Sequence, residues 1–158
     1  MLISASNEIP LALDNNIFTH LRNRQSYILR KIIEYNAHTK DFPVIPSTTL
    51  FEANFGIQKA LVKNEISHEK STYLHQEIDR LLINHRIIDF DRKASKIAAY
   101  IFARLSQSDR NKHWRDLFIV ATAISHNYGL ATQNKKDMEL IANHLPESLD
   151  LRLAIWKP

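Results

Sequence analysis

Four acidic residues stand near points where short apolar segments give way to helical patterns, and carboxylates in such places can bind metal ions. Asp14 ends the segment IPLALD, and Glu52 follows FPVIP by a few residues. Asp116 lies in HWRDLFIVATAI, and Asp137 lies in TQNKKDMELI. Each acid also has a local explanation. Asp14 and Asp137 are typical of helix caps. Glu52 can form a capping box with Thr49, and the dipole of a helix that begins at Asp116 would favour that acid.

The four acids together would oppose folding unless a cation lay between them. Two carboxylates about 5 Å apart repel each other by roughly 3 kcal/mol at an effective dielectric constant of about 20. Oxygen ligands without cysteine select Mg²⁺ or Mn²⁺. Such ions activate water and stabilise the leaving oxygen when a phosphate ester is hydrolysed. The pattern therefore raises the hypothesis of metal-dependent hydrolysis of phosphate esters.

Three polar residues near these acids are candidates for a supporting role. The side chains of Asn16, Thr132 and Asn134 can hydrogen-bond a metal carboxylate or a bound water and fix its orientation. Each residue is equally suited to a turn or a helix cap, so the sequence leaves both roles open.

The apolar pattern predicts a scaffold that brings these distant residues together. Segments typical of buried strands recur at residues 9–14, 42–46, 87–90, 129–133 and 151–156. Helical patterns lie between them, at residues 16–21, 26–35, 50–62, 74–83, 97–105, 117–124 and from 137 onward. Strands separated by helices predict right-handed crossovers and a three-layer α/β domain with a mostly parallel sheet. Ligands of such sheets gather beyond the carboxyl ends of the strands, where Asp14 lies.

Length and composition favour one domain in the cytoplasm. The 158 residues suffice for a single core, and two glycines and five prolines leave no linker or repeat. Cysteine is absent, and the sequence contains neither a membrane-spanning segment nor a secretory signal. The formal net charge of +4 is compatible with a polyanionic partner.

Several other chemistries lack their motifs. No histidine pair has the spacing of a zinc site, no Gly-x-Ser-x-Gly segment occurs, and two glycines cannot build a phosphate-binding loop. A receiver-like signalling domain would need an acidic pair near the first strand. A phosphatase with an aspartyl nucleophile would need Asp at the position of Asn16.

Four segments together resemble the successive motifs of a known family. They are IPLALDNNIF, VIPSTTLFEANFG, IIDFDRKASKIAAYIFARL and WRDLFIVATAISHNYGLATQNKKDMELI. In this order and spacing they are similar to the motifs of PIN-domain ribonucleases, specifically toxins of the VapC type. The most specific part runs from Asp116 to Asp137, where an acid precedes an apolar helix and a strand ending in Thr-x-Asn precedes the last acid.

The resemblance implies a single three-layer α/β/α PIN-like domain over residues 1–158. It also implies an endoribonuclease that uses Mg²⁺ or Mn²⁺, held by Asp14, Glu52, Asp116 and Asp137, with Thr132 and Asn134 in support. Further implications are an RNA substrate, a homodimer, and a cognate antitoxin that blocks the active site in a toxin–antitoxin hetero-oligomer. Helices around residues 27–35 and 50–62 are candidate edges of the antitoxin groove.

The chain departs from the family pattern at three positions. Asn15 follows the first acid, where Thr or Ser is usual, Gln133 replaces a common Arg, and Met138 replaces a frequent aromatic residue. Arg115 can pair with Asp116 in competition with metal, or contact a substrate phosphate, and His113 is a second candidate contact to substrate. The alternative function is a catalytically weak PIN-like scaffold that binds RNA.

Overall fold

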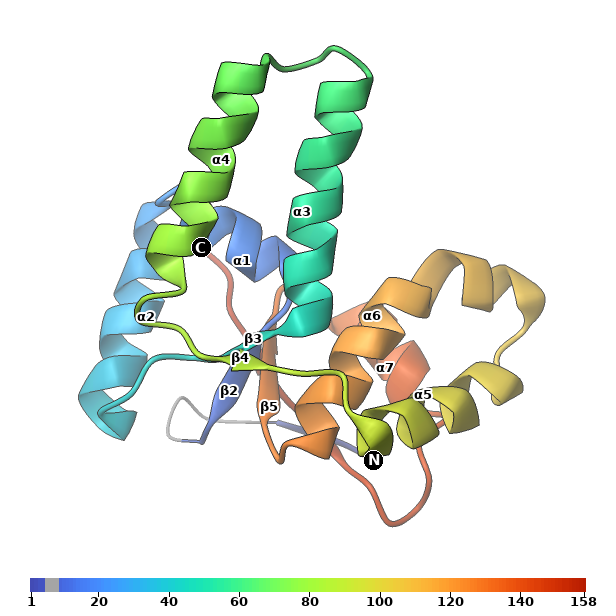
Figure 1. The fold of residues 1–158 in the computed structure, drawn as a ribbon. Helices are drawn as coiled ribbons and strands as arrows, with labels where there is room; N and C mark the ends of the chain where they lie inside the picture. Colours follow the sequence, from blue (N-terminus) through green and yellow to red (C-terminus); the bar gives the residue numbers. More distant parts are fainter. Residues whose placement is uncertain (5–8) are drawn as a thin grey trace.

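The computed structural model describes residues 1–4 and 9–158 and contains seven helices and six strands within them (Figure 1). The strands are β1 (Leu2–Ser4), β2 (Leu11–Leu13), β3 (Ile45–Pro46), β4 (Ile87–Ile88), β5 (Gly129–Thr132) and β6 (Leu151–Ile155). The helices are α1 (Asn15–Arg22), α2 (Ser26–Thr39), α3 (Ser47–Val62), α4 (His68–Leu81), α5 (Arg92–Arg104), α6 (Gln107–Ser125) and α7 (Lys135–Ala142).

All strand pairs in the described residues are parallel. Four strands form one sheet in the order β1-β6-β5-β2, and β3 pairs with β4. A bridge between Ala12 and Val44 places the smaller pair beside β2. The predicted α/β class with a mostly parallel sheet is confirmed. The sequence did not predict β1, which lies at the edge of the sheet and pairs with β6.

Helices cover both faces of the sheet, as the three-layer prediction requires. Ala12 and Leu130 point into a core formed with α5, α6 and α7. Leu11, Leu13 and Ala131 point into a second core, formed with α1 to α4. Successive strand residues alternate between the two cores, so the strands read as continuous apolar segments. Figure 1 shows the two groups of helices on either side of the strands, with α3 and α4 extending away from the sheet as a pair.

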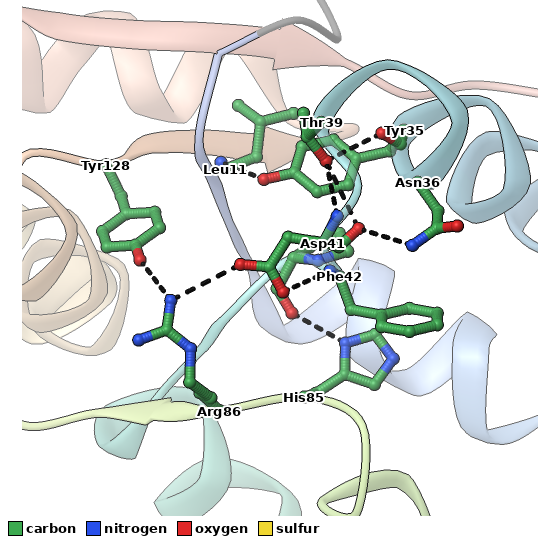
Figure 2. Close-up of polar contacts among 10 residues, drawn as sticks. Leu11, Tyr35, Asn36, Thr39, Asp41, Phe42, His85, Arg86 and Tyr128 are labelled. Carbon is green, nitrogen blue, oxygen red and sulfur yellow. Dashed lines mark hydrogen bonds and ion pairs between the residues drawn. The ribbon is translucent and has the colours of Figure 1, made fainter.

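Polar contacts fix the segment that leads into β3 and α3 (Figure 2). Asp41 lies 3.6 Å from Arg86, which donates a hydrogen bond of 3.0 Å to the Tyr128 hydroxyl. The buried ring of His85 donates from Nδ1 to the carbonyl of Pro43 at 2.7 Å. These contacts join the segments around β3, β4 and β5, and they place the start of α3 beside the sheet.

No helix within residues 1–4 and 9–158 is long and apolar enough to cross a bilayer.

Candidate active site at the carboxyl edge of the sheet

Asp14 is buried directly beyond β2, with 2% of its surface exposed. It caps α1, and Oδ1 accepts a hydrogen bond of 2.9 Å from the backbone N–H of Asn16. Oδ2 accepts a hydrogen bond from the hydroxyl of Thr132, the last residue of the neighbouring strand β5. Burial raises the pKa of Asp14 above its ordinary value, and these hydrogen bonds oppose the rise. The local cap interpretation is confirmed, but a cap alone does not require a carboxylate to be buried at a strand end.

Asp137 is oriented by the turn between β5 and α7. The backbone N–H of Asn134 donates to the Thr132 hydroxyl at 3.0 Å, and the Asn134 amide donates to Oδ2 of Asp137. Asn134 is the cap of α7, and Asp137 lies in its first turn, so the prediction that Asp137 is the cap was wrong. A chain of hydrogen bonds therefore links Asp137 to Asp14 through Asn134 and Thr132.

Glu52 approaches from α3, which begins five residues earlier, at Ser47. The predicted capping box was wrong, because the Thr49 hydroxyl instead donates to the carbonyl of Leu13 at 2.9 Å. Within the described part of the chain, Oε1 of Glu52 is buried and has no hydrogen-bond partner. Burial raises the pKa of Glu52 to about 7, with Asp14 adding to the rise and Arg115 opposing it.

Asp116 lies in the middle of α6 rather than at a helix start, so the predicted stabilisation by a helix dipole was wrong. The helix begins at Gln107, because the Ser106 hydroxyl caps it by accepting from the N–H of Asp109 at 3.1 Å. Burial, together with the charges of Asp14, Glu52 and Asp137, raises the pKa of Asp116 to about 7, and Arg115 opposes the rise. The structure thus brings four acids from four parts of the chain close enough to perturb one another.

These residues suit a divalent cation. Ligand atoms of His113, Asp116 and Asp137 all lie within 4.8 Å of one another, a set found among the described residues. A positive ion would relieve the repulsion that raises the pKa of Asp116. Asp14 and Glu52 lie outside this set of three, although their charges act on Asp116. The donors are mostly carboxylate oxygens, as Mg²⁺ and Mn²⁺ require.

The Arg115 guanidinium lies over aromatic rings. Its guanidinium carbon is 5.0 Å from the ring centre of Trp114 and 5.4 Å from that of Phe55. In residues 1–4 and 9–158 it forms no ion pair, although its charge lowers the pKa of both Glu52 and Asp116. Of the two roles left open by the sequence, competition with metal through a close ion pair does not occur in this structure.

A pocket of about 370 Å³ lies beside Glu52 and Arg115. Half of its lining residues are aromatic, and they come from α3, α6 and the segment after β4. The lining residues are Ser47, Thr48, Phe51, Glu52, Phe90, Trp114, Arg115 and Phe118. Glu52 therefore belongs both to the acidic cluster and to the wall of this pocket.

Asn16 and Gln133 contribute differently from what the sequence suggested. Asn16 is exposed, and its recorded contact with Asp14 comes from its backbone N–H. The amide of Gln133 donates to the hydroxyl of Tyr27 and lies 3.3 Å from Nδ1 of His20, which also contacts Tyr27. This network of His20, Tyr27 and Gln133 was not predicted from the sequence. The one sequence feature that pointed to it is the polar residue at position 133, between the candidate site residues Thr132 and Asn134.

Three comparisons relate the chain to known proteins. A family model described as "PIN domain" matches residues 11–143. Comparison with curated proteins found no match. Among solved structures, a chain of VapBC2 from Rickettsia felis is 21% identical, with a TM-score of 0.67 over 99% of this chain and 100% of that one. A chain of VapBC from Salmonella typhimurium is 19% identical, with a TM-score of 0.66 over 94% and 99%. A chain of FitAcB from Neisseria gonorrhoeae is 19% identical, with a TM-score of 0.61 over 90% and 95%.

Proposed function

Because the chain belongs to the PIN domain family, we propose that it is a metal-dependent endoribonuclease and the toxin of a toxin–antitoxin pair. The observation that carries the proposal is the meeting of Asp14, Glu52, Asp116 and Asp137 at one edge of the sheet, where their charges perturb one another. Such an arrangement opposes folding of the metal-free protein, and it becomes useful when a cation is bound.

In this proposal the four acids bind the ion, and three neighbouring residues orient them. Asp14, Glu52, Asp116 and Asp137 hold Mg²⁺ or Mn²⁺. A divalent ion held there supplies a water nucleophile at neutral pH and offsets charge on a phosphate. Thr132 fixes the rotamer of Asp14, and Asn134 fixes that of Asp137. The backbone N–H of Asn16 holds the second oxygen of Asp14.

The pocket beside Glu52 supports RNA as the substrate. Nucleobases stack on aromatic rings, and Phe51, Phe90 and Trp114 offer such rings next to the acids. Arg115 adds a cation at the rim that can contact a phosphate. The net charge of +4 favours association with a polyanion. RNA in the cytoplasm is the substrate that we propose.

Exposed apolar side chains support a protein partner. Leu29 and Ile33 on α2, and Phe51 and Phe55 on α3, are each at least 39% exposed. These two helices are the predicted edges of a groove for the antitoxin. A structural neighbour from Klebsiella pneumoniae is named as a toxin–antitoxin complex. We propose that this chain also binds a cognate antitoxin, and that it forms a homodimer or a toxin–antitoxin hetero-oligomer.

The proposal is tested by comparing the purified chain with Asp116→Asn and with Asp79→Asn, a matched exchange at an exposed position on α4. Each protein is incubated with a structured RNA mixture in Mn²⁺ or in chelator, and the cuts are mapped. We expect the wild type and Asp79→Asn to cleave only with Mn²⁺. Cleavage by Asp116→Asn should fall by at least roughly 100-fold, because the variant loses a carboxylate that holds the catalytic ion.

Other outcomes would contradict the nuclease proposal in distinct ways. Equal cleavage by Asp116→Asn, or cleavage in chelator, would assign the cuts to a contaminating ribonuclease. RNA binding without metal-dependent cleavage would favour the alternative, a catalytically weak RNA-binding scaffold. The same variant is expected to unfold at a higher temperature than the wild type in chelator, since it relieves repulsion.

A further inference from the structure

His113 is buried, and its Nδ1, which has no hydrogen-bond partner within residues 1–4 and 9–158, faces Asp116 of the acidic cluster. It lies on α6 one turn before Asp116, and 3% of its surface is exposed. Its Nδ1 is 3.9 Å from Oδ2 of Asp116, which is beyond hydrogen-bonding distance. Among the described residues, no other group pairs with this nitrogen. Leaving such a nitrogen unpaired destabilises a protein, so a bonding partner is expected.

A cation fits this position better than an RNA substrate does. The sequence suggested a substrate contact for His113, but its side chain is almost completely enclosed. Its ligand nitrogen and the carboxylates of Asp116 and Asp137 lie within 4.8 Å of one another. Two ligands of one ion, each about 2.1 Å from it, are at most about 4.2 Å apart. Small rotations of these side chains would therefore bring all three onto a single ion.

We propose that His113 supplies a nitrogen ligand to an ion shared with Asp116 and Asp137, and that the site therefore prefers a first-row transition ion such as Mn²⁺ over Mg²⁺. This inference rests on the proposed function, because it requires the acidic cluster to bind a divalent ion. Mg²⁺ takes oxygen ligands and exchanges them reluctantly for nitrogen, whereas imidazole is an ordinary ligand of transition ions.

Pulsed electron paramagnetic resonance tests the ligand directly. Mn²⁺ is added to the metal-free protein, and coupling between its unpaired electrons and ¹⁴N is recorded. We expect ¹⁴N coupling in the wild type, and its replacement by ¹⁵N coupling when histidine alone is labelled with ¹⁵N. The coupling should disappear in His113→Gln and remain in His38→Gln, which changes an exposed histidine on α2. The comparison of ¹⁴N with ¹⁵N histidine needs only the wild type, so it tests for a histidine ligand even if His113→Gln does not fold.

Calorimetric titration with Mn²⁺ and with Mg²⁺ tests the preference. We expect the wild type and His38→Gln to bind Mn²⁺ at least roughly tenfold more tightly than Mg²⁺. In His113→Gln, affinity for Mn²⁺ should fall by roughly tenfold, while affinity for Mg²⁺ should change little. Circular dichroism in chelator checks that the variant is folded.

The outcomes separate this inference from the proposed function. Failure of the wild type to bind either ion would overturn both. Mn²⁺ binding without nitrogen coupling from histidine would overturn the role of His113 and leave a site made of carboxylates alone. An equal loss of affinity for both ions in His113→Gln, again without coupling in the wild type, would make His113 a packing residue.

Discussion

Glu52 and Asp116 have carboxyl groups whose pKa values are both raised to about 7, so the metal-free protein should respond to pH near neutrality. In the unfolded chain these groups lose their protons at much lower pH. The folded state therefore binds more protons between about pH 5 and pH 7, and its stability falls as the pH rises through that range. Metal binding would remove this disadvantage.

Urea unfolding in chelator at pH 5, 6, 7 and 8 measures the effect. Between pH 5 and pH 8, we expect the free energy of unfolding of the wild type to fall by at least about 1 kcal/mol more than that of the double variant Glu52→Gln/Asp116→Asn. This bound is set well below the energy that the two raised pKa values alone would give, because water partly screens both groups.

The buried histidine His85 changes stability with pH in the opposite direction. Burial lowers the pKa of His85, so its contribution to stability increases as the pH rises through the unfolded value near 6.5. His85 is present in both proteins, and the difference between them cancels its effect. Parallel pH profiles for the two proteins would contradict the assignment of raised pKa values to the cluster.

At the scale of elements, the turn between β5 and α7 is held on two sides. Thr132 and Asn134 connect it to the acids, while Gln133 connects it to His20 on α1 and Tyr27 on α2. We therefore expect the contacts of Gln133 with these helices to limit how far the acids can move.

Tyr27→Phe removes the hydroxyl that contacts both Gln133 and His20, so each of them loses a hydrogen-bond partner. We expect the free energy of unfolding to fall by about 1–2 kcal/mol, which lowers the melting temperature by roughly 5 °C in a chain of this size. Amide hydrogen exchange at residues 133–136 should become roughly tenfold faster, because the turn loses an anchor.

Tyr35→Phe is the matched control. The Tyr35 hydroxyl accepts from the backbone N–H of Leu11 at 3.1 Å, so its loss also leaves a buried group unpaired (Figure 2). The control should destabilise the protein without selectively accelerating exchange at residues 133–136. The same exchange pattern in both variants would mean that the network does not hold the turn.

Particular elements show what the sequence could predict. Strands β2 and β5 were recognisable because both of their faces are buried and their residues are almost all apolar. The α7 helix was recognisable from the polar turn before it. The start of α6 was placed too late, because its first turns are polar, although Ser106 and Asp109 have the spacing of an N-terminal cap.

Other features depend on tertiary structure and leave no local signal. The short strand β1 exists through pairing with β6, which is far away in the sequence. The burial of His113 results from the packing of its helix against the rest of the domain, and periodicity alone does not indicate it. The four acids proposed from the sequence interact in the structure, but the local roles assigned to Glu52 and Asp116 were wrong. Their part in catalysis is still a proposal.

At the scale of the whole molecule, the acids connect both helical layers to the sheet. Asp14 follows β2, Glu52 comes from α3 on one face, and Asp116 and Asp137 come from α6 and α7 on the other. An ion bound between them would therefore stabilise the entire fold. Ligand binding to the folded state alone adds about 2.7 kcal/mol at a concentration one hundred times the dissociation constant.

Thermal unfolding of the metal-free protein with increasing Mn²⁺ checks this coupling. We expect the melting temperature of the wild type and of Asp79→Asn to rise by roughly 5–10 °C at saturating ion. Asp14→Asn should lose most of the increase while remaining folded. An equal rise in Asp14→Asn would indicate that the ion binds elsewhere.

The hydrogen bond between Thr132 and Asp14 joins residues 118 positions apart in the chain. During synthesis, Thr132 is added 118 residues after Asp14, and Asn134 and Asp137 follow it. A nascent chain therefore lacks the strand, the turn and the last acid that complete the cluster until residue 137 has been translated. If the protein cleaves RNA, this order of assembly delays cleavage while the chain is still attached to the ribosome and its messenger.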